Sequence, residues 1–269
     1  RTVTFSGTYT GFLIHVARAM APWRLVLLPC VILLMLAYVL KLITRQRLKE
    51  LNQALMVGYN VERVRLMPHV ESYADKVIAT NVRRGALAQI AQDRADGYRL
   101  VLATASYRLY VEPIARRLGF DAVIATDHLS QDLRYVRAKI AGENCYDTGK
   151  LRMIKAWMAA EAIDRAHAHV RAYSDHVSDH PMLHFADEAV ATTPSRKLKS
   201  LAPQMGWQVV DWRANWRRVN WSVHSAFGFW TLLFIFMWAF TGVYLAFPEP
   251  FAAVVDYLEP FEEDNFDPR

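Results

Sequence analysis

Two aspartates stand four residues apart in the segment YSDHVSDHPML, residues 173–183, which directly follows a short apolar run. Asp175 and Asp179 supply hard carboxylate oxygens, and these favour Mg²⁺ over softer metals. An aspartate pair just ahead of a helix is also a common capping arrangement. Taken alone, the pair therefore leaves both a metal site and a helix start open.

Earlier in the chain, hydroxyl, amide and ammonium groups stand where a phosphate could bind. Thr104 lies near the end of the apolar run YRLVLATAS, residues 98–106, and Ala105 and Ser106 precede a predicted helix. Backbone N–H groups at a helix start bind anions. Lys150 opens the predicted helix KLRMIKAW and could bring a compact cation to the same phosphate. Singly, a strand-end threonine is more often a cap, and such a lysine is usually solvated.

Short apolar runs alternate with amphipathic segments along the central part of the chain. The predicted strands cover residues 98–106, 121–126, 169–174, 189–193 and 207–212. This alternation predicts an α/β fold, a three-layer Rossmann-like parallel sheet with helices on both faces. In such sheets the chemistry lies beyond the carboxyl ends of the strands. Thr104, Ser106, Asp175 and Asp179 would all fall there.

The order of these elements resembles the haloacid dehalogenase superfamily, specifically its phosphoserine-phosphatase-like subfamily IB. The strand ending in TAS, the segment GENCYDTGK at 142–150 and the aspartate segment carry the resemblance, which extends from the first residue to about Trp212. It implies an enzyme that uses magnesium. The implied phosphate-binding residues are Thr104, Ala105, Ser106 and Lys150, with Thr104 and Lys150 also catalytic; Asp175 is the implied metal ligand, and Asp179 supports the metal site.

The opening residues resemble the end of the family's first motif, DxDxT. Arg1 and Thr2 match its last two positions, so its two aspartates would lie immediately before Arg1, on an apolar strand central to the sheet. The resemblance implies a magnesium-dependent phosphomonoester hydrolase that forms an aspartyl-phosphate intermediate. We expect the chain as given to be inactive, because the nucleophile and the acid/base aspartate are not in it.

The expected domains are a core at 1–11 and 76–212, and a helical cap at 12–75. The cap contains the apolar run LVLLPCVILLMLAYVL, residues 25–40, which is interrupted by Pro29. A buried or membrane-surface helical pair is favoured over a single span, because a span would separate the two halves of the site. The run suggests a lipid-like phosphoester substrate or attachment to the bilayer surface; a well-buried cap helix is the alternative.

A second apolar run, residues 226–247, carries no charge over a length that spans a bilayer of about 30 Å. Arginines precede it and acidic residues follow, so we expect a transmembrane helix with the preceding domain on the cytoplasmic side of the membrane. Residues 216–269 resemble a transmembrane segment of PepSY-associated membrane proteins. His224, near the membrane entrance, is either a haem or metal ligand or simply hydrogen-bonded.

The net charge bears on the kind of partner that the chain binds, and the two cysteines bear on whether it contains a disulfide. The formal net charge is +6, but the cations form no aromatic-interleaved stripe, so we expect no nucleic acid partner. Cys30 and Cys145 lie in different contexts, and we expect no disulfide. The expected partners are a phosphorylated small molecule or lipid-like phosphoester, and a membrane.

The alternative function is a non-catalytic membrane component with a PepSY-like, haem- or redox-linked role. A receiver-like domain is disfavoured because its acidic pair belongs near the start.

Overall fold

The structure is a computed structural model that describes residues 2–129, 132–212 and 216–258, without the side chains of 216–228 and 255–258. The chain divides into two compact units, Arg1–Arg213 and Ala214–Arg269, and each is described by itself.

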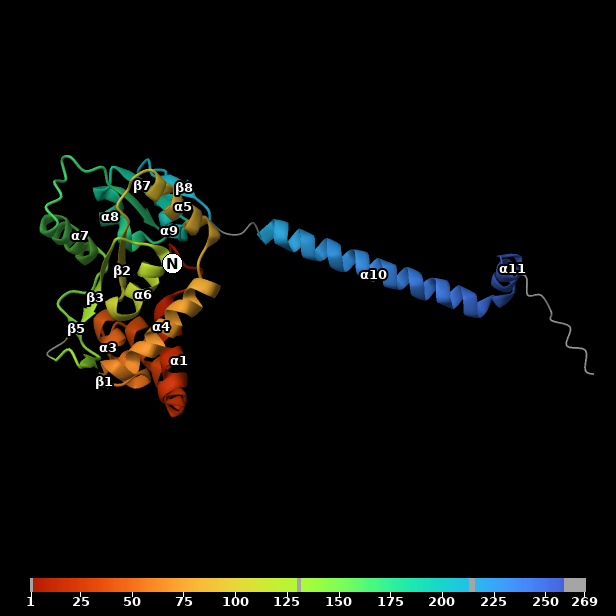
Figure 1. Cartoon of the computed structure of the whole chain (residues 1–269), viewed down its shortest axis with the longest axis horizontal. Helices are drawn as coiled ribbons and strands as arrows, with labels where there is room; N and C mark the ends of the chain where they lie inside the picture. Colours follow the sequence, from red (N-terminus) through yellow and green to blue (C-terminus); the bar gives the residue numbers. More distant parts are fainter. Residues whose placement is uncertain (1, 130–131, 213–215, 259–269) are drawn as a thin grey trace, which may run out of the picture. The chain divides into compact units, whose positions relative to one another are not determined.

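Helices dominate the first part of unit one. They are α1 (Thr8–Met20), the short 3-10 helix η1 (Pro22–Leu27), α2 (Leu28–Val39), α3 (Arg45–Met56) and α4 (Arg63–Thr80), with the short strand β1 (Asn60–Glu62) before α4. Pro22 and Pro29 occupy first-turn positions of η1 and α2, where a missing N–H costs nothing. Thr44 caps α3 by accepting a hydrogen bond from the Arg47 amide. Figure 1 shows α1, α3 and α4 together at one end of this unit.

The rest of unit one alternates strands and helices, as the sequence predicts. In order these are α5 (Arg84–Ala95), β2 (Val101–Tyr107), α6 (Arg108–Leu118), β3 (Ala122–His128), β4 (Tyr135–Arg137), β5 (Ile140–Ala141), α7 (Thr148–Ala160), β6 (Arg171–Ser174), η2 (Val177–Asp179), α8 (His180–Phe185), β7 (Glu188–Thr192), α9 (Arg196–Leu201) and β8 (Gln208–Val210). Gly119 ends α6 in the left-handed conformation, with φ of 78°. The predicted α/β fold is confirmed.

The described strands form two three-stranded sheets and one two-stranded antiparallel sheet. One sheet has the order β2-β3-β5, the other β6-β7-β8, and β1 pairs with β4. The pairs β2–β3, β6–β7 and β7–β8 are parallel. Among the described strands, β2 pairs only with β3 and β6 only with β7, so each keeps one edge without a strand partner (Figure 1). The family resemblance predicts a parallel sheet whose central first strand lies before Arg1, and the two separate sheets fit that expectation.

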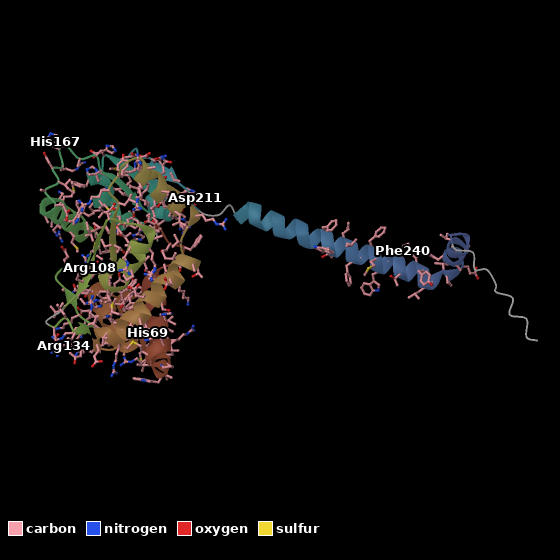
Figure 2. The ribbon with its side chains drawn as sticks, viewed as in Figure 1. His69, Arg108, Arg134, His167, Asp211 and Phe240 are labelled. Carbon is pink, nitrogen blue, oxygen red and sulfur yellow. The ribbon has the colours of Figure 1, made fainter. Side chains whose placement is uncertain are left out.

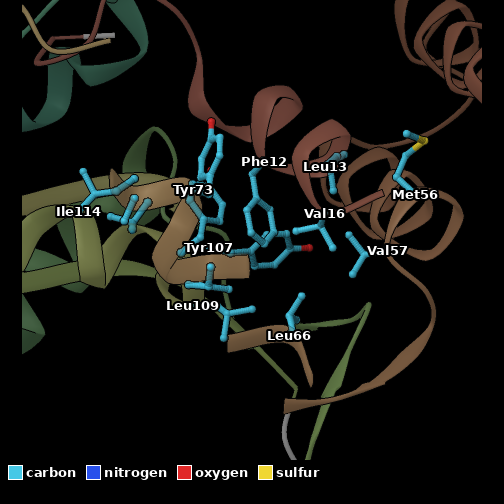
Figure 3. Packing of buried hydrophobic residues seen from close by; sticks show 14 of the residues in the cluster. Phe12, Leu13, Val16, Met56, Val57, Leu66, Tyr73, Tyr107, Leu109 and Ile114 are labelled. Carbon is cyan, nitrogen blue, oxygen red and sulfur yellow. The ribbon is translucent and has the colours of Figure 1, made fainter. Parts of the chain in front are cut away.

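An aromatic core joins the helices to the first sheet (Figure 3). Phe12 of α1 stacks on Tyr110 of α6 at a ring-centroid distance of 4.5 Å, and Tyr73 of α4 meets Phe12 edge-on at 5.5 Å. All three side chains are buried. Because α1, α4 and α6 each contribute one ring, this packing holds the helical region on the sheet that carries Thr104.

The apolar run at 25–40 is not buried. The 18 residues Pro22–Val39 have a mean hydropathy of 2.0, and only Val31 of α2 is buried against the rest of the unit. This exposure contradicts the alternative of a well-buried cap helix and leaves the suggested attachment to the bilayer surface open. Because α2 packs along α3, only the side that faces α3 is covered by another long helix. The remaining sides of α2 are also apolar, and they stay exposed.

The second unit contains two helices, α10 (Trp216–Ala246) and α11 (Pro248–Leu258). Within α10, Phe229–Ala246 is long and apolar enough to cross a membrane, with a mean hydropathy of 1.8 and none of it buried. Figure 2 shows its side chains standing out from the helix around Phe240. This helix fits the predicted transmembrane segment. His224 lies outside the described side chains, so its ligand assignment stays a prediction.

Candidate active site

A cavity of about 500 Å³ lies between the two sheets of the first unit. Thr104, Ser106, Lys150, Asp175 and Asp179 all line it. These residues come from the end of β2, the start of α7 and the segment that follows β6, three places far apart in the sequence. Apolar side chains from β2, β6, α6, α7 and α8 line much of the remainder, together with polar groups such as Gln89, Asp93 and Arg171. Five of the six predicted site residues therefore meet at one cavity.

The lysine and the second aspartate form a buried ion pair. Lys150 Nζ lies 2.6 Å from Asp179 Oδ1, and the two side chains are only 8% and 12% exposed. The Ser174 hydroxyl donates to Asp179 Oδ2 at 2.6 Å. Both oxygens of this carboxylate are thus engaged inside the protein. Asp179 fixes the ammonium group at the cavity wall, which is a compact positive charge in a poorly solvated place.

Asp175 directly follows β6 and faces the start of the chain. Its Oδ1 accepts a hydrogen bond from Thr2 Oγ1 at 2.9 Å, and its carbonyl accepts one from the Ser195 amide at 2.8 Å. Burial raises the pKa of Asp175, whereas the hydrogen bond from the Thr2 hydroxyl lowers it. A carboxylate that is ionised and partly buried is suited to binding a cation.

The end of β2 forms the turn that the sequence predicted for phosphate. The β2–β3 register shifts between Thr104 and Tyr107, and Thr104 Oγ1 accepts from the Ser106 amide at 3.2 Å. Ala105 is absent from the cavity lining and instead turns its carbonyl to Lys49 of α3. The turn thus presents one hydroxyl-bearing residue on each side of Ala105 to the cavity.

The metal-binding capacity of this cavity rests on few protein ligands. Among the residues that the structure describes, no group of three or more histidine, cysteine, aspartate or glutamate side chains could hold an ion. The donor set fits magnesium in type, since carboxylate oxygens are its preferred protein ligands. Magnesium commonly keeps several water and phosphate oxygens and needs only one or two carboxylates. Asp175 meets that requirement in part.

Comparison with known families decides the identity of this arrangement. The family described as haloacid dehalogenase-like hydrolase matches residues 1–184, which is more than half of the chain. The chain belongs to the haloacid dehalogenase-like hydrolase family. A second family, the PepSY-associated TM region, matches residues 189–267, so its match includes β7 and β8 as well as the apolar helix.

Curated relatives are identical to this chain at about a third of the aligned positions. The phosphoserine phosphatase SerB1 of Mycobacterium tuberculosis is 32% identical over 158 residues, 58% of this chain and 50% of that protein. A putative hydrolase of Mycobacterium leprae is 31% identical over 175 residues, 64% of this chain and 56% of that protein. The chain spans about half the length of the curated relatives it matches.

Solved structures show the same fold. A protein of unknown function from Bordetella pertussis Tohama I has a TM-score of 0.67 and 27% identity, with 77% of this chain and 91% of that one covered. A phosphoserine phosphatase captured as a phospho-aspartyl intermediate analogue has a TM-score of 0.52 and 15% identity, with 81% and 92% covered. The second likeness concerns the haloacid dehalogenase-like fold alone.

One buried group beside this haloacid dehalogenase-like site was not predicted. Lys49 Nζ donates to the Ala105 carbonyl at 2.7 Å and to Asn144 Oδ1 at 3.0 Å, and it lies 4.4 Å from the Tyr107 ring centroid. Burial, together with the nearby charge of Arg45, lowers the pKa of Lys49 to about 7. Lys49 thereby ties the helix α3 to the turn that carries Thr104.

Lys49 escaped prediction because its helix buries polar residues. The buried face of α3 is Lys49, Glu50, Asn52, Gln53 and Met56. A hydrophobic pattern assigns such positions to solvent. The available signal was the spacing of these residues by three and four, which places them on one face whatever their polarity.

Proposed function

We propose that the first unit is the catalytic domain of a magnesium-dependent phosphomonoesterase. The observation that carries this proposal is the meeting of Thr104, Lys150 and Asp175 at one cavity between β2 and β6. A hydroxyl, a buried cation and an ionised carboxylate in one place suit a dianionic phosphoryl group and a divalent ion. Membership of the haloacid dehalogenase-like family supports the same reaction class.

In this proposal each described residue has one role. The Thr104 hydroxyl binds a phosphoryl oxygen; the phosphate-binding roles expected of Ala105 and Ser106 are not part of this proposal, because Ala105 does not line the cavity and the Ser106 amide donates to Thr104 Oγ1. Lys150, held by Asp179, offsets negative charge on the transferring group without needing to be repositioned during the reaction. Asp175 binds the magnesium ion, which would neutralise further charge on the phosphoryl oxygens, and Asp179 supports that site through Lys150.

We infer further that a β-strand immediately upstream of Arg1 lies between β2 and β6 and carries the two aspartates of the family's first motif. Among the described strands, β2 and β6 each have one edge without a strand partner, and residues of both strands line the cavity, whose surface is mainly apolar. Parallel strands lie about 4.8 Å apart, so one strand can hydrogen-bond to both edges at once. The Thr2–Asp175 hydrogen bond places the following residues at the mouth of this gap.

The proposed reaction has two steps. A carboxylate oxygen of the first aspartate attacks phosphorus in line with the ester oxygen, the P–O ester bond breaks, and the second aspartate donates a proton to the leaving alcohol. Water then attacks the aspartyl phosphate, its proton passes to the second aspartate, and orthophosphate and the free nucleophile are released. Lys150 and Thr104 hold the phosphoryl oxygens throughout both steps.

The substrate and location follow from the rest of the chain. We propose a phosphorylated small molecule or a lipid-like phosphoester as substrate, because an exposed apolar helix belongs to the same unit as the cavity. Arg213, Arg217 and Arg218 precede the apolar stretch of α10 and acidic residues follow it, which favours a catalytic unit on the cytoplasmic face of the membrane.

The test uses the chain extended by its natural upstream residues. We expect hydrolysis of para-nitrophenyl phosphate that depends on added magnesium, is abolished by a chelator and returns when magnesium is restored. The measurement is the release of nitrophenol under each condition. Upstream residues without a DxD pair, or hydrolysis that ignores the chelator, would overturn the proposal.

A further inference from the structure

We propose that η1 and α2, which together form the apolar segment Pro22–Val39, dock on an anionic lipid bilayer and enter one leaflet without crossing it. This inference concerns a surface outside the cavity and does not rest on the phosphatase assignment. Its starting observation is the exposure of large apolar side chains where a water-facing helix would be polar. The exposed set is Trp23, Val26, Leu28, Ile32, Leu33, Met35, Leu36, Tyr38, Val39, Leu40 and Leu42.

The composition of α2 separates it from the other helices of this unit. It contains no charged residue over its 12 positions, LPCVILLMLAYV. Only Val31 is buried, while Ile32 and Val39 are 66% and 71% exposed. A contiguous apolar surface of this kind marks a binding face for protein or lipid. The residues around it decide between those two partners.

The charge pattern favours lipid with anionic headgroups. The chain has no aspartate or glutamate before Glu50. Exposed cations stand on both sides of the apolar run, Arg18 before it and Lys41, Arg45 and Arg47 after it. Trp23 at one end and Tyr38 at the other place amphipathic rings where the headgroup region would begin. Basic residues next to an anionic bilayer surface are attracted to its headgroups.

The packing of the flanking helices excludes a transmembrane arrangement. The helix α1 contacts η1, α3 and α4, and α2 packs along α3. Both ends of the segment Pro22–Val39 are therefore packed on the same helical region. A transmembrane span would require the two ends to lie on opposite sides of the bilayer. A segment anchored in this way can only lie in the interface or dip into one leaflet.

A native cysteine makes the test direct. Cys30 of α2 is exposed and Cys145 is buried, so an environment-sensitive nitrobenzoxadiazole label attaches to the full-length chain at position 30. The chain is reconstituted into phosphatidylcholine–phosphatidylglycerol vesicles. Quenching by nitroxides on the lipid acyl chains is then compared with quenching by iodide in water. The matched control carries Cys30→Ser and His167→Cys. The His167 side chain is 87% exposed. Figure 2 shows it at the end of this unit opposite to His69, which lies on α4 in the helical region.

We expect the label at position 30 to be quenched several-fold more by acyl-chain nitroxides than by iodide, and the label at 167 to show the reverse. Ile32→Asp with Leu36→Asp should return the label at 30 to iodide quenching. Equal iodide quenching at both positions would overturn the proposal, because the segment Pro22–Val39 would then lie in water. Protection from both quenchers would overturn the proposal too, since protein would then cover the segment Pro22–Val39. Unchanged quenching in pure phosphatidylcholine would refute the role of the cations.

Discussion

Replacing Asp179 with alanine is expected to lower the free energy of unfolding of the first unit by about 3–5 kcal/mol, because it leaves the Lys150 ammonium buried without its partner. The pair is short, 2.6 Å, and both side chains are almost fully enclosed. The Ser174 hydroxyl loses its acceptor at the same time. The measurement is the urea dependence of Cys145 thiol labelling in a full-length Cys30→Ser background. Cys145 is buried in this unit, so its labelling reports the unit's own unfolding.

Two variants distinguish a broken ion pair from a general packing defect. Lys150→Met combined with Asp179→Leu should recover most of the lost stability, because no uncompensated charge remains. Arg152 lies on the same helix as Lys150 and forms an exposed ion pair with Glu143, which precedes that helix. Arg152→Ala should leave the urea midpoint unchanged. If the double variant were as unstable as Asp179→Ala, the pair would not be the source of the loss.

Replacing Asp175 with asparagine in the chain extended upstream is expected to lower kcat/KM for magnesium-dependent hydrolysis by about 10²–10³-fold, the usual loss on removing one group that stabilises developing charge. Asparagine keeps the shape of the side chain and can still accept the hydrogen bond from Thr2. Its neutral oxygen is a much weaker ligand for magnesium, so the concentration of magnesium needed for half-maximal rate should rise as well.

Asp187→Asn is the matched control for Asp175→Asn. Asp187 is another carboxylate of the same unit, paired with Arg165 at 2.8 Å on the surface. Its replacement should leave both the rate and the magnesium requirement unchanged. A similar loss in the two variants would show that a general change in charge, and not a ligand at position 175, governs the rate.

Local patterns in the sequence were sufficient for the strands and the site cluster. The apolar runs ending at Thr104 and Ser174 became β2 and β6, and their carboxyl ends carry the cavity residues. This worked because strand alternation and helix periodicity are local signals, and because parallel strands bring their ends together. The order of three motifs then indicated the family, which no single motif could do.

Features that depend on distant partners could not be predicted. The interruption between β2 and β6 was expected only from the family resemblance, which places the central strand before Arg1, because no pattern within either strand reports it. The burial of Lys49 depends on Ala105 and Asn144, which lie 56 and 95 residues further along the chain. The exposure of α2 had the same origin: its sequence suits a buried helix equally well, and only the absence of covering elements among the described residues separates the two.

The most direct measurement is a crystal structure of the chain extended upstream, grown with magnesium and beryllium trifluoride as a phosphoryl mimic. The account predicts a new strand hydrogen-bonded to β2 and β6, a magnesium ion about 2.1 Å from an Asp175 oxygen, and fluorides next to the Thr104 hydroxyl and Lys150 Nζ. Side chains filling the gap between β2 and β6, or ligands bound away from Asp175, would contradict it.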